Sequence, residues 1–178
     1  MDADNGWIGA LEADLQAMAY ADIDLDRDAE VAERIRIERA GVGLLDRVNA
    51  TSSPVEVHVS SGRRLRGVVR DGAQEWLVIE TGNSPITHSL VLGQAIVWVT
   101  GLRPGTRQSG VLRTRSVASV CRRWARDRAE IQAELRGGSM ITGRMSAAYS
   151  DHVDVVSISA EPYAITYAAL EVLTRTFD

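Results

Sequence analysis

The sequence predicts a mainly β fold with helices (an α+β chain), made of two tandem units behind an N-terminal acidic helix. Each unit has one helix followed by five short strands that curl into a small barrel. The first observation is a repeated glycine pair, because Gly62 and Gly67 recur as Gly138 and Gly143, 76 positions later. The second is a set of apolar pairs at the same offset: Val55–Ile131, Leu77–Val153, Ile79–Val155 and Ile96–Val172. The third is that a stretch of helical period precedes each set of strand-like stretches.

These patterns divide the chain into four segments. Residues 1–25 form an acidic helical segment, and residues 26–101 form the first unit. Residues 102–110 lie in a stretch rich in glycine, proline and polar residues, which is typical of a linker. The second unit then covers residues 111–178.

Three stretches have the period of an amphipathic helix. Residues 7–20 place Ile8, Leu11, Leu15 and Met18 on one face. Residues 26–49 begin at Asp26, a good N-cap, and align Ile37, Gly41, Leu44 and Val48, although Gly41 and Gly43 weaken this helix. Residues 111–129 align Val117, Val120, Cys121 and Trp124.

Strands follow the second and third helices. In the first unit they are expected around VEVHV, LRGVV, EWLVIE, HSLVL and AIVWV, and in the second around IQAEL, MITGRM, HVDVVSI and AITYAALEVLTR. We expect Gly62 and Gly138 to supply positive φ in the first hairpin turn of each unit. Gly67 and Gly143 lie inside the second strand, where a missing side chain lets the strand bend toward a barrel. All four glycines are therefore predicted to be structural.

Composition predicts a cytoplasmic protein. The chain has no apolar run long enough to span a membrane, and its start lacks the features of a signal peptide. Its single cysteine, Cys121, has no partner for an internal disulfide or a zinc motif.

Charge is distributed unevenly along the chain. Residues 1–30 hold nine of the 24 acids and one of the 20 basic residues, a net charge of −8, whereas the other 15 acids and 19 arginines give +4. Lysine is absent, so every basic side chain is a planar guanidinium that can bind a carboxylate or phosphate with two hydrogen bonds. Codon bias in a GC-rich genome is the alternative explanation for the missing lysines.

Residues 60–80, SSGRRLRGVVRDGAQEWLVIE, carry G-x-x-x-x-G across the first hairpin, and residues 91–96, VLGQAI, open the last strand pair. These stretches look like the first and second Sm motifs, so the first unit resembles the Sm-like fold of the LSm proteins and bacterial Hfq. The second unit keeps Gly138 and Gly143 but has YAALEV, residues 167–172, in place of the second motif. The whole chain also resembles an uncharacterised family of high-GC Gram-positive bacteria that is often labelled a Fis family transcriptional regulator, although no helix-turn-helix of the Fis type is evident.

The resemblance implies a fold more than a binding pocket. Sm-like proteins that bind uridine-rich RNA use an Asp-x-x-x-Asn pattern before the third strand and an arginine in the second motif. Here Ala73 and Leu77 stand at the first two positions, and Leu92 and Ala168 replace the arginine of the two units. The usual base pocket is therefore expected to be absent, while the fold remains.

Enzyme motifs are not found. The chain lacks G-x-S-x-G, H-E-x-x-H, the P-loop and the dinucleotide fingerprint, so we expect no enzyme activity and no cofactor. The histidines His58, His88 and His152 are scattered. A metal site at His152 with Asp151 and Asp154 is a weak alternative to three surface residues, and we predict no metal.

Arginine placement is the strongest functional signal. Arg63, Arg64, Arg66 and Arg70 surround the first hairpin, where Trp76 offers a stacking surface if it is exposed. Arg115, Arg122 and Arg126 are spaced by seven and four on one helical face, with Arg113, Arg123 and Arg128 beside them. These arginines can bind nucleic-acid phosphates or an acidic protein, or they can be solvated or paired with acids such as Glu33, Glu38 and Glu130.

Two functional hypotheses follow. The first is a non-enzymatic, regulatory module that binds nucleic acid, RNA rather than DNA, through arginine–phosphate contacts, with residues 1–30 competing for the same surface. The second is a scaffolding protein that binds protein partners, or other copies of itself in a ring, through barrel edges and the amphipathic first helix.

Overall fold

The computed structural model describes residues 30, 31, 33, 34, 36, 41–82, 85–102 and 115–177. The chain divides into two compact units, residues 1–42 and residues 43–178. In the first, Glu30, Val31, Glu33, Arg34 and Arg36 are helical, as predicted, and Arg34 pairs with Glu30 at 3.0 Å. The predicted helix over residues 7–20 and the linker from residue 103 lie outside the described residues.

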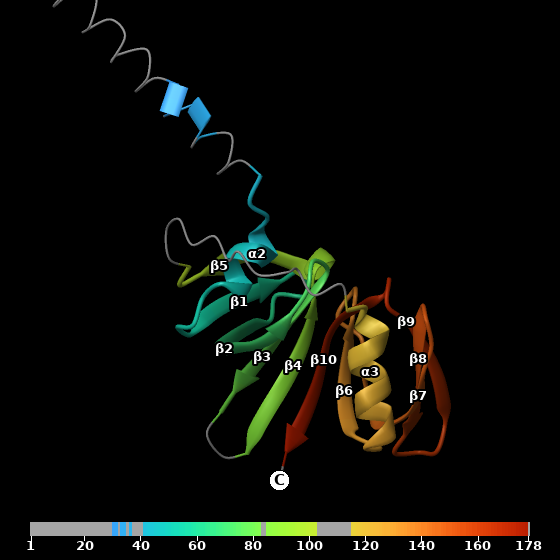
Figure 1. Ribbon diagram of the computed structural model, residues 1–178. Coiled ribbons are helices and arrows are strands. Elements are labelled where there is room, and N and C mark those ends of the chain that lie inside the picture. The colour runs from blue at the N-terminus through green and yellow to red at the C-terminus, as the bar shows by residue number, and fades with distance from the viewer. Residues whose placement is uncertain are drawn as a thin grey trace, which may run out of the picture. The chain divides into compact units, whose positions relative to one another are not determined.

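Residues 43–178 form one open sheet of ten antiparallel strands with two helices among the described residues (Figure 1). The two predicted tandem units are called repeats from here on. The first repeat contains α2 (Leu44–Asn49), β1 (Val55–Val59), β2 (Arg64–Gly72), β3 (Trp76–Thr81), β4 (Ile86–Leu92), the 3-10 turn η1 (Gly93–Ala95) and β5 (Ile96–Thr100). The second repeat contains α3 (Val117–Arg126), β6 (Glu130–Leu135), β7 (Met140–Ala148), β8 (His152–Ser157), β9 (Pro162–Thr166) and β10 (Leu170–Phe177). The prediction of a mainly β chain with a helix and five strands per repeat is confirmed.

The strand order is β5-β1-β2-β3-β4-β10-β6-β7-β8-β9. Each repeat therefore has the same internal order, with its last strand beside its first. The end strands β4 and β5 do not pair with each other, because β4 pairs with β10. Closed barrels are accordingly not shown by the strand pairing, and β5 and β9 form the two outer edges of the sheet.

The repeats agree in register as well as in order. β2 and β7 begin at Arg64 and Met140 and end at Gly72 and Ala148, 76 positions apart at both ends. A bulge interrupts β2 between Val69 and Asp71, and β7 has one between Met145 and Ala147, again 76 positions later. The same backbone irregularity in both copies supports an internal duplication more strongly than the glycine spacing alone.

One detail of the predicted alignment is wrong. Ile96 pairs with Val59 in the first repeat, and the residue that pairs with the corresponding Leu135 is Leu170, not Val172. The offset therefore falls from 76 to 74 after β8, because β9 has five residues where β4 has seven, while the connections before the two strands, residues 82–85 and 158–161, are equally long. Val172 consequently corresponds to Trp98.

The first glycine of each pair has its predicted role in a turn, whereas the structure explains the second by a close approach of the neighbouring strand rather than by the predicted barrel bend. Gly62 and Gly138 have φ angles of +91° and +85° in the first hairpin turn of each repeat. At Gly67, an added Cβ would lie 2.0 Å from the Glu80 carbonyl oxygen, and at Gly143 the corresponding distance to the Val156 oxygen is 2.3 Å. No side chain fits there, because the neighbouring strand passes too close.

The helices α2 and α3 both begin later in the chain than the sequence predicts. Gly43 is the extended N-cap of α2, and its N–H donates to Asp46 Oδ2 at 3.2 Å, so the long predicted helix of residues 26–49 is interrupted at Gly41–Gly43. Glycine disfavours the helix interior, and the Asp46 carboxylate stabilises a new start at Leu44. Similarly, α3 begins at Val117 rather than near residue 111.

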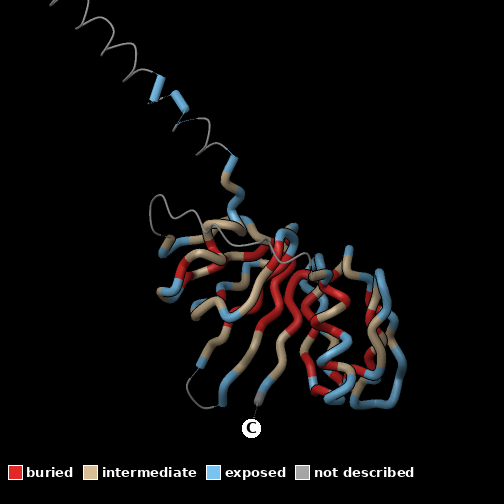
Figure 2. Tube along the Cα trace, viewed as in Figure 1, coloured by how far each residue is buried: buried red, intermediate tan, exposed pale blue. Residues whose placement is uncertain are grey.

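Buried side chains concentrate in the middle strands of the sheet and on one face of α3 (Figure 2). Trp124 on α3 is 2% exposed and lies in the same apolar cluster as Met145 on β7. That cluster also contains Trp76 and Leu90 from the first repeat. The core is therefore continuous across the line where the repeats meet.

We call that line the joint: the ladder between β4 and β10 with the side chains that cross it. Six residue pairs run from Val91–Val172 to Ile86–Phe177. Glu171, 1% exposed, accepts hydrogen bonds from the Ser60 hydroxyl and, at 2.9 Å, from the Ser61 N–H. Arg63 Nη1 donates to Glu134 Oε2 at 3.2 Å. The first hairpin turn of the first repeat thus binds two carboxylates of the second.

Replacing Trp124 with alanine should lower the free energy of unfolding by about 3–5 kcal/mol, because a large buried ring would leave a cavity between α3 and β7. Urea denaturation followed by circular dichroism measures this. The control is Ile158→Ala, since Ile158 is 87% exposed and its loss should change the free energy of unfolding by less than about 0.5 kcal/mol. Equal effects of the two substitutions would contradict the packing of α3.

Candidate nucleic-acid interface

The helix α3 separates apolar from basic side chains. Val117, Val120, Cys121 and Trp124 are buried against the sheet. Arg122, Arg123 and Arg126 are exposed. The three- and four-residue spacing of a helix places the two groups on different faces, as the sequence predicts.

Arg122 and Arg126 line one shallow hollow of about 430 Å³, together with Ser119 and Ala125 of α3 and Ser146 of β7. The Ser119 hydroxyl donates to the Ser116 carbonyl at 2.7 Å, and the Ser146 hydroxyl donates to the Asp154 carbonyl at 3.2 Å. Neither arginine forms an ion pair with an acid in the described part of the chain. The donors that remain for a ligand in this hollow are therefore two guanidinium groups one helical turn apart, which suit an anion.

The acid at the end of this helix does not neutralise them. Asp127 follows α3 and accepts a hydrogen bond from Arg175 Nη1 at 2.8 Å. The negative charge of Asp127 is thus balanced by Arg175 of β10 and not by an arginine of α3. We call Arg122, Arg123 and Arg126 the α3 arginines; Arg128 is exposed just beyond the helix.

Arg115 does not join the α3 arginines. It precedes the helix, and its Nη2 forms an ion pair with Asp71 of β2. Its guanidinium lies 5.9 Å from the Trp76 ring centroid, and its carbonyl accepts a hydrogen bond from Trp76 Nε1 at 2.7 Å. The predicted stripe of Arg115, Arg122 and Arg126 is therefore reduced to two members, and Arg115 connects the repeats. Arg113 lies outside the described residues.

The four arginines of the first hairpin divide into paired and unpaired members. Arg63 pairs with Glu134, and Arg70 pairs with Glu80 at 2.5 Å. The hydrogen bond between Arg70 and Glu80 lowers the pKa of Glu80 and raises that of Arg70. Arg64 and Arg66 are exposed on the outer face of β2 and form no ion pair with a described acid.

The condition for stacking at Trp76, exposure of its ring, is not met. Trp76 is 0% exposed and its N–H is used within the chain, so it offers no surface to a ligand. The half-buried Trp98 of β5 lies beside Arg64 instead, with the guanidinium carbon 5.8 Å from the ring centroid. Sequence reasoning missed Trp98, because its strand contacts β1 and lies far from the arginines along the chain.

The other titratable groups that the structure describes form no comparable site. His152 Nδ1 lies 2.7 Å from Asp151 and its Nε2 lies 3.9 Å from Asp154, and the hydrogen bond to His152 lowers the pKa of Asp151. Within the described ranges, no three histidine, cysteine or acidic side chains are grouped as metal ligands. Burial raises the pKa of the Cys121 thiol to about 12.

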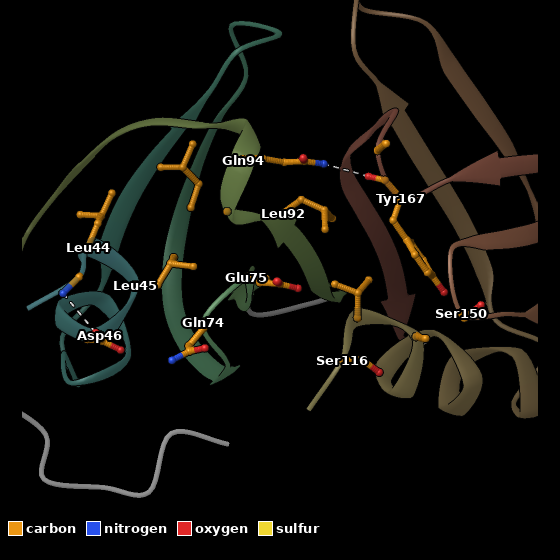
Figure 3. Close-up of a pocket in the computed structure, with 16 residues that line it drawn as sticks. Leu44, Leu45, Asp46, Gln74, Glu75, Leu92, Gln94, Ser116, Ser150 and Tyr167 are labelled. Atoms are coloured by element: carbon orange, nitrogen blue, oxygen red, sulfur yellow. Dashed lines mark hydrogen bonds between the residues drawn. The ribbon is translucent and has the colours of Figure 1, made fainter. Parts of the chain in front are cut away.

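A larger groove of about 790 Å³ lies between α2, the start of α3 and the ends of β4 and β9 (Figure 3). Leu45, Leu92 and Val117 contribute apolar surface, and Asp46 and Glu75 contribute carboxylates. Gln94 Nε2 donates to the Tyr167 carbonyl at 3.0 Å across it. Because its described lining has acids and no arginine, this groove does not suit a phosphate.

Comparison with protein-family models, with curated proteins and with solved structures gives no match to this chain. In the part of the chain that the structure describes, no helix has the length and apolar character needed to cross a bilayer.

Arg115 and Arg122 should differ in what their loss costs. Arg115→Ala should lower the free energy of unfolding by about 1 kcal/mol, because Asp71 would lose its partner and Trp76 its neighbouring cation. Arg122→Ala should change that free energy by less than about 0.5 kcal/mol, since the side chain is exposed. Thermal denaturation of both variants tests the difference, and an equal loss would show that Arg115 has no structural role.

Proposed function

We propose that this protein is a non-enzymatic, regulatory nucleic-acid-binding module whose α3 arginines bind backbone phosphates, with RNA preferred to DNA. The observation that carries the proposal is the pair of guanidinium groups of Arg122 and Arg126 in one hollow, where neither has an ion-pair partner among the described residues. Seven other described arginines have acidic partners. A cation without a partner on a helix bound firmly to the core is a typical phosphate contact.

The rigidity of α3 supports this role. The helix is anchored by buried Trp124 and Val120, so its exposed side chains start from fixed positions. Each arginine that replaces a condensed counterion at a phosphate adds favourable, salt-dependent free energy. The preference for RNA rests on the resemblance to Sm-like proteins, whose plan of one helix and five strands suits both repeats. We accordingly propose that each repeat is an Sm-like unit, although their end strands do not close in a barrel.

The double substitution Arg122→Ala/Arg126→Ala should weaken binding to a fluorescently labelled, uridine-rich oligoribonucleotide. The slope of the logarithm of the binding constant against that of salt concentration should become shallower by about 1.4, because each lost contact to a single strand removes about 0.7. Fluorescence anisotropy over a KCl series measures both quantities.

The matched control is Arg34→Ala/Arg36→Ala. It removes the same charge from two arginines that already pair with Glu30 and Glu33 outside the sheet. This control should leave the affinity close to that of the unmodified protein. If both double variants weaken binding equally, net charge rather than the α3 surface determines it, and the proposed site is wrong.

A second candidate function is assembly with protein partners or further copies through sheet edges. The observation that favours it is the joint, where one repeat already adds a strand to the other. The edge strand β5 corresponds to β10, and the edge strand β9 corresponds to β4; β10 and β4 are the two strands that pair at the joint. Unpaired edge strands are common sites of strand addition. The predicted amphipathic first helix, a further contact in this hypothesis, lies outside the described residues.

An assembly role predicts a solution mass of at least two chains, reduced to one chain by Val97→Lys on β5. Val97 is 59% exposed on the edge strand, so a lysine there should block pairing without disturbing the fold. Light scattering coupled to gel filtration measures the mass. A single-chain mass at all concentrations for the unmodified protein would exclude self-assembly.

A further inference from the structure

The first and last strands of each repeat form an equivalent surface, β6 with β10 in the second repeat and β1 with β5 in the first, and this surface has different surroundings in the two repeats. In the second repeat, the first hairpin turn of the first repeat reaches this surface at Glu134 and Glu171. Val172 is 0% exposed there and Glu134 is 5% exposed. The corresponding residues of the first repeat, Trp98 and His58, are only half buried. No other repeat lies against them among the described residues.

The residues at these corresponding positions have changed in chemistry. His58 stands where the second repeat has Glu134, and Trp98 where it has Val172. On the neighbouring strand, Arg64 and Arg66 correspond to Met140 and Thr142. A surface that accepts a hairpin turn through carboxylates in the second repeat is therefore aromatic and cationic in the first.

Strand pairing brings these side chains into one cluster. Trp98 pairs with His58 across β5 and β1, and His58 pairs with Arg64 across β1 and β2. The Trp98 and His58 rings contact edge to face, with centroids 4.7 Å apart and planes at 67°. Arg66 lies two pairs further along, opposite Glu56, and so on the same face as Arg64. We call Trp98, His58, Arg64 and Arg66 the Trp98 face.

One polar atom of this face lacks a partner. His58 Nδ1 is buried and has no hydrogen bond within the described residues. A buried polar atom without a partner costs free energy, so this part of the face is less well satisfied than its counterpart at Glu134.

A second copy of this chain is a poor fit for the Trp98 face. If copies joined as the two repeats do, the turn that docks would be the one at residues 136–139. Arg136 in that turn corresponds to Ser60. The Arg136 N–H donates to the Ala169 carbonyl, and the Ser60 N–H donates to the equivalent Ala95 carbonyl. By the same correspondence Arg136 would face Val97 where Ser60 faces Glu171, so it would lack the carboxylate that the joint supplies. The two arginines of the Trp98 face instead favour a polyanion.

We propose that the Trp98 face binds single-stranded nucleic acid, with one base stacked at Trp98 and the adjoining phosphates bound by Arg64 and Arg66. This deepens the proposed function, on which it rests. Exposed aromatic side chains beside arginines on a sheet surface are the usual means of holding splayed bases. Bases in a duplex are already stacked, so the Trp98 face should distinguish single strands from double strands, which the α3 arginines alone do not.

The test compares a labelled, uridine-rich single strand of about 12 nucleotides with a duplex RNA of the same length. Trp98→Leu should weaken single-strand binding on the order of tenfold and leave duplex binding unchanged. Trp98→Phe, which retains an aromatic ring, should restore most of the affinity. Arg66→Ala should also weaken binding, whereas Arg144→Ala, which removes an exposed arginine paired with Glu130, is the matched control.

Tryptophan fluorescence provides a second readout. Trp76 and Trp124 are 0% and 2% exposed, so single-strand binding should quench Trp98 and leave both buried tryptophans largely unaffected. The measurement is made in a Trp7→Phe background, because Trp7 lies outside the described residues. Quenching should disappear in Trp98→Leu, and circular dichroism confirms that each variant is folded.

Three results would overturn the inference: unchanged single-strand affinity in folded Trp98→Leu, equal losses for single strand and duplex, or a dimer that this substitution dissociates. The last would assign the Trp98 face to a second copy. Failure of the proposed function gives a different pattern, since Arg122→Ala/Arg126→Ala would then leave binding to both probes unchanged. The two ideas can therefore fail separately.

Discussion

The burial of two carboxylates at the joint is the constraint on which the arrangement of the repeats depends. Glu171 receives donors from Ser60 and Ser61, and Glu134 receives one from Arg63. A carboxylate removed from water is costly unless its oxygens are satisfied, and removing one partner of a buried pair typically costs about 3–5 kcal/mol. The hairpin turn of the first repeat therefore fits the second repeat and not its own equivalent surface, where Val97 and His58 replace the acids.

The arginines of the two repeats fall into two groups, one paired with acids of neighbouring elements and one exposed. Arg63, Arg70 and Arg115 hold neighbouring elements together through Glu134, Glu80 and Asp71. Another set of arginines remains on the surface without acidic partners in the described residues: Arg64, Arg66, Arg122, Arg123 and Arg126. The two repeats share one plan, yet the surface that contacts the other repeat in the second repeat has no such contact among the described residues in the first.

Local pattern was sufficient to predict the strands, and long-range contact was not. Alternating residues such as Val55 and Val57 reveal a strand, and Gly62 reveals its turn, because these signals depend on neighbours in the chain. The pairing of β4 with β10 has no such signal, since either strand is an adequate partner for several others. The start of α3 was misplaced because Arg115 fits the helical spacing, although its ion pair with Asp71 holds it outside the helix.

The candidate site was predictable to a similar extent. The spacing of Arg122 and Arg126 places them on one helical face, and the structure agrees. The position of Trp98 beside Arg64 required knowledge of which strands are neighbours, and the burial of Trp76 required knowledge of the core. An ungapped alignment of the repeats also missed that β9 is two residues shorter than β4, because an alternating pattern reveals a strand but does not fix where it begins.

The burial of Cys121 has a practical consequence for spectroscopy. The thiolate is the reactive form of cysteine, and a thiol with a pKa of about 12 that is 0% exposed is almost entirely protonated and shielded from reagents. A maleimide dye or nitroxide should therefore attach selectively to a cysteine introduced at the surface, with the native residue left in place. Pairs of such probes on the two repeats would report distances across the sheet without first altering its core.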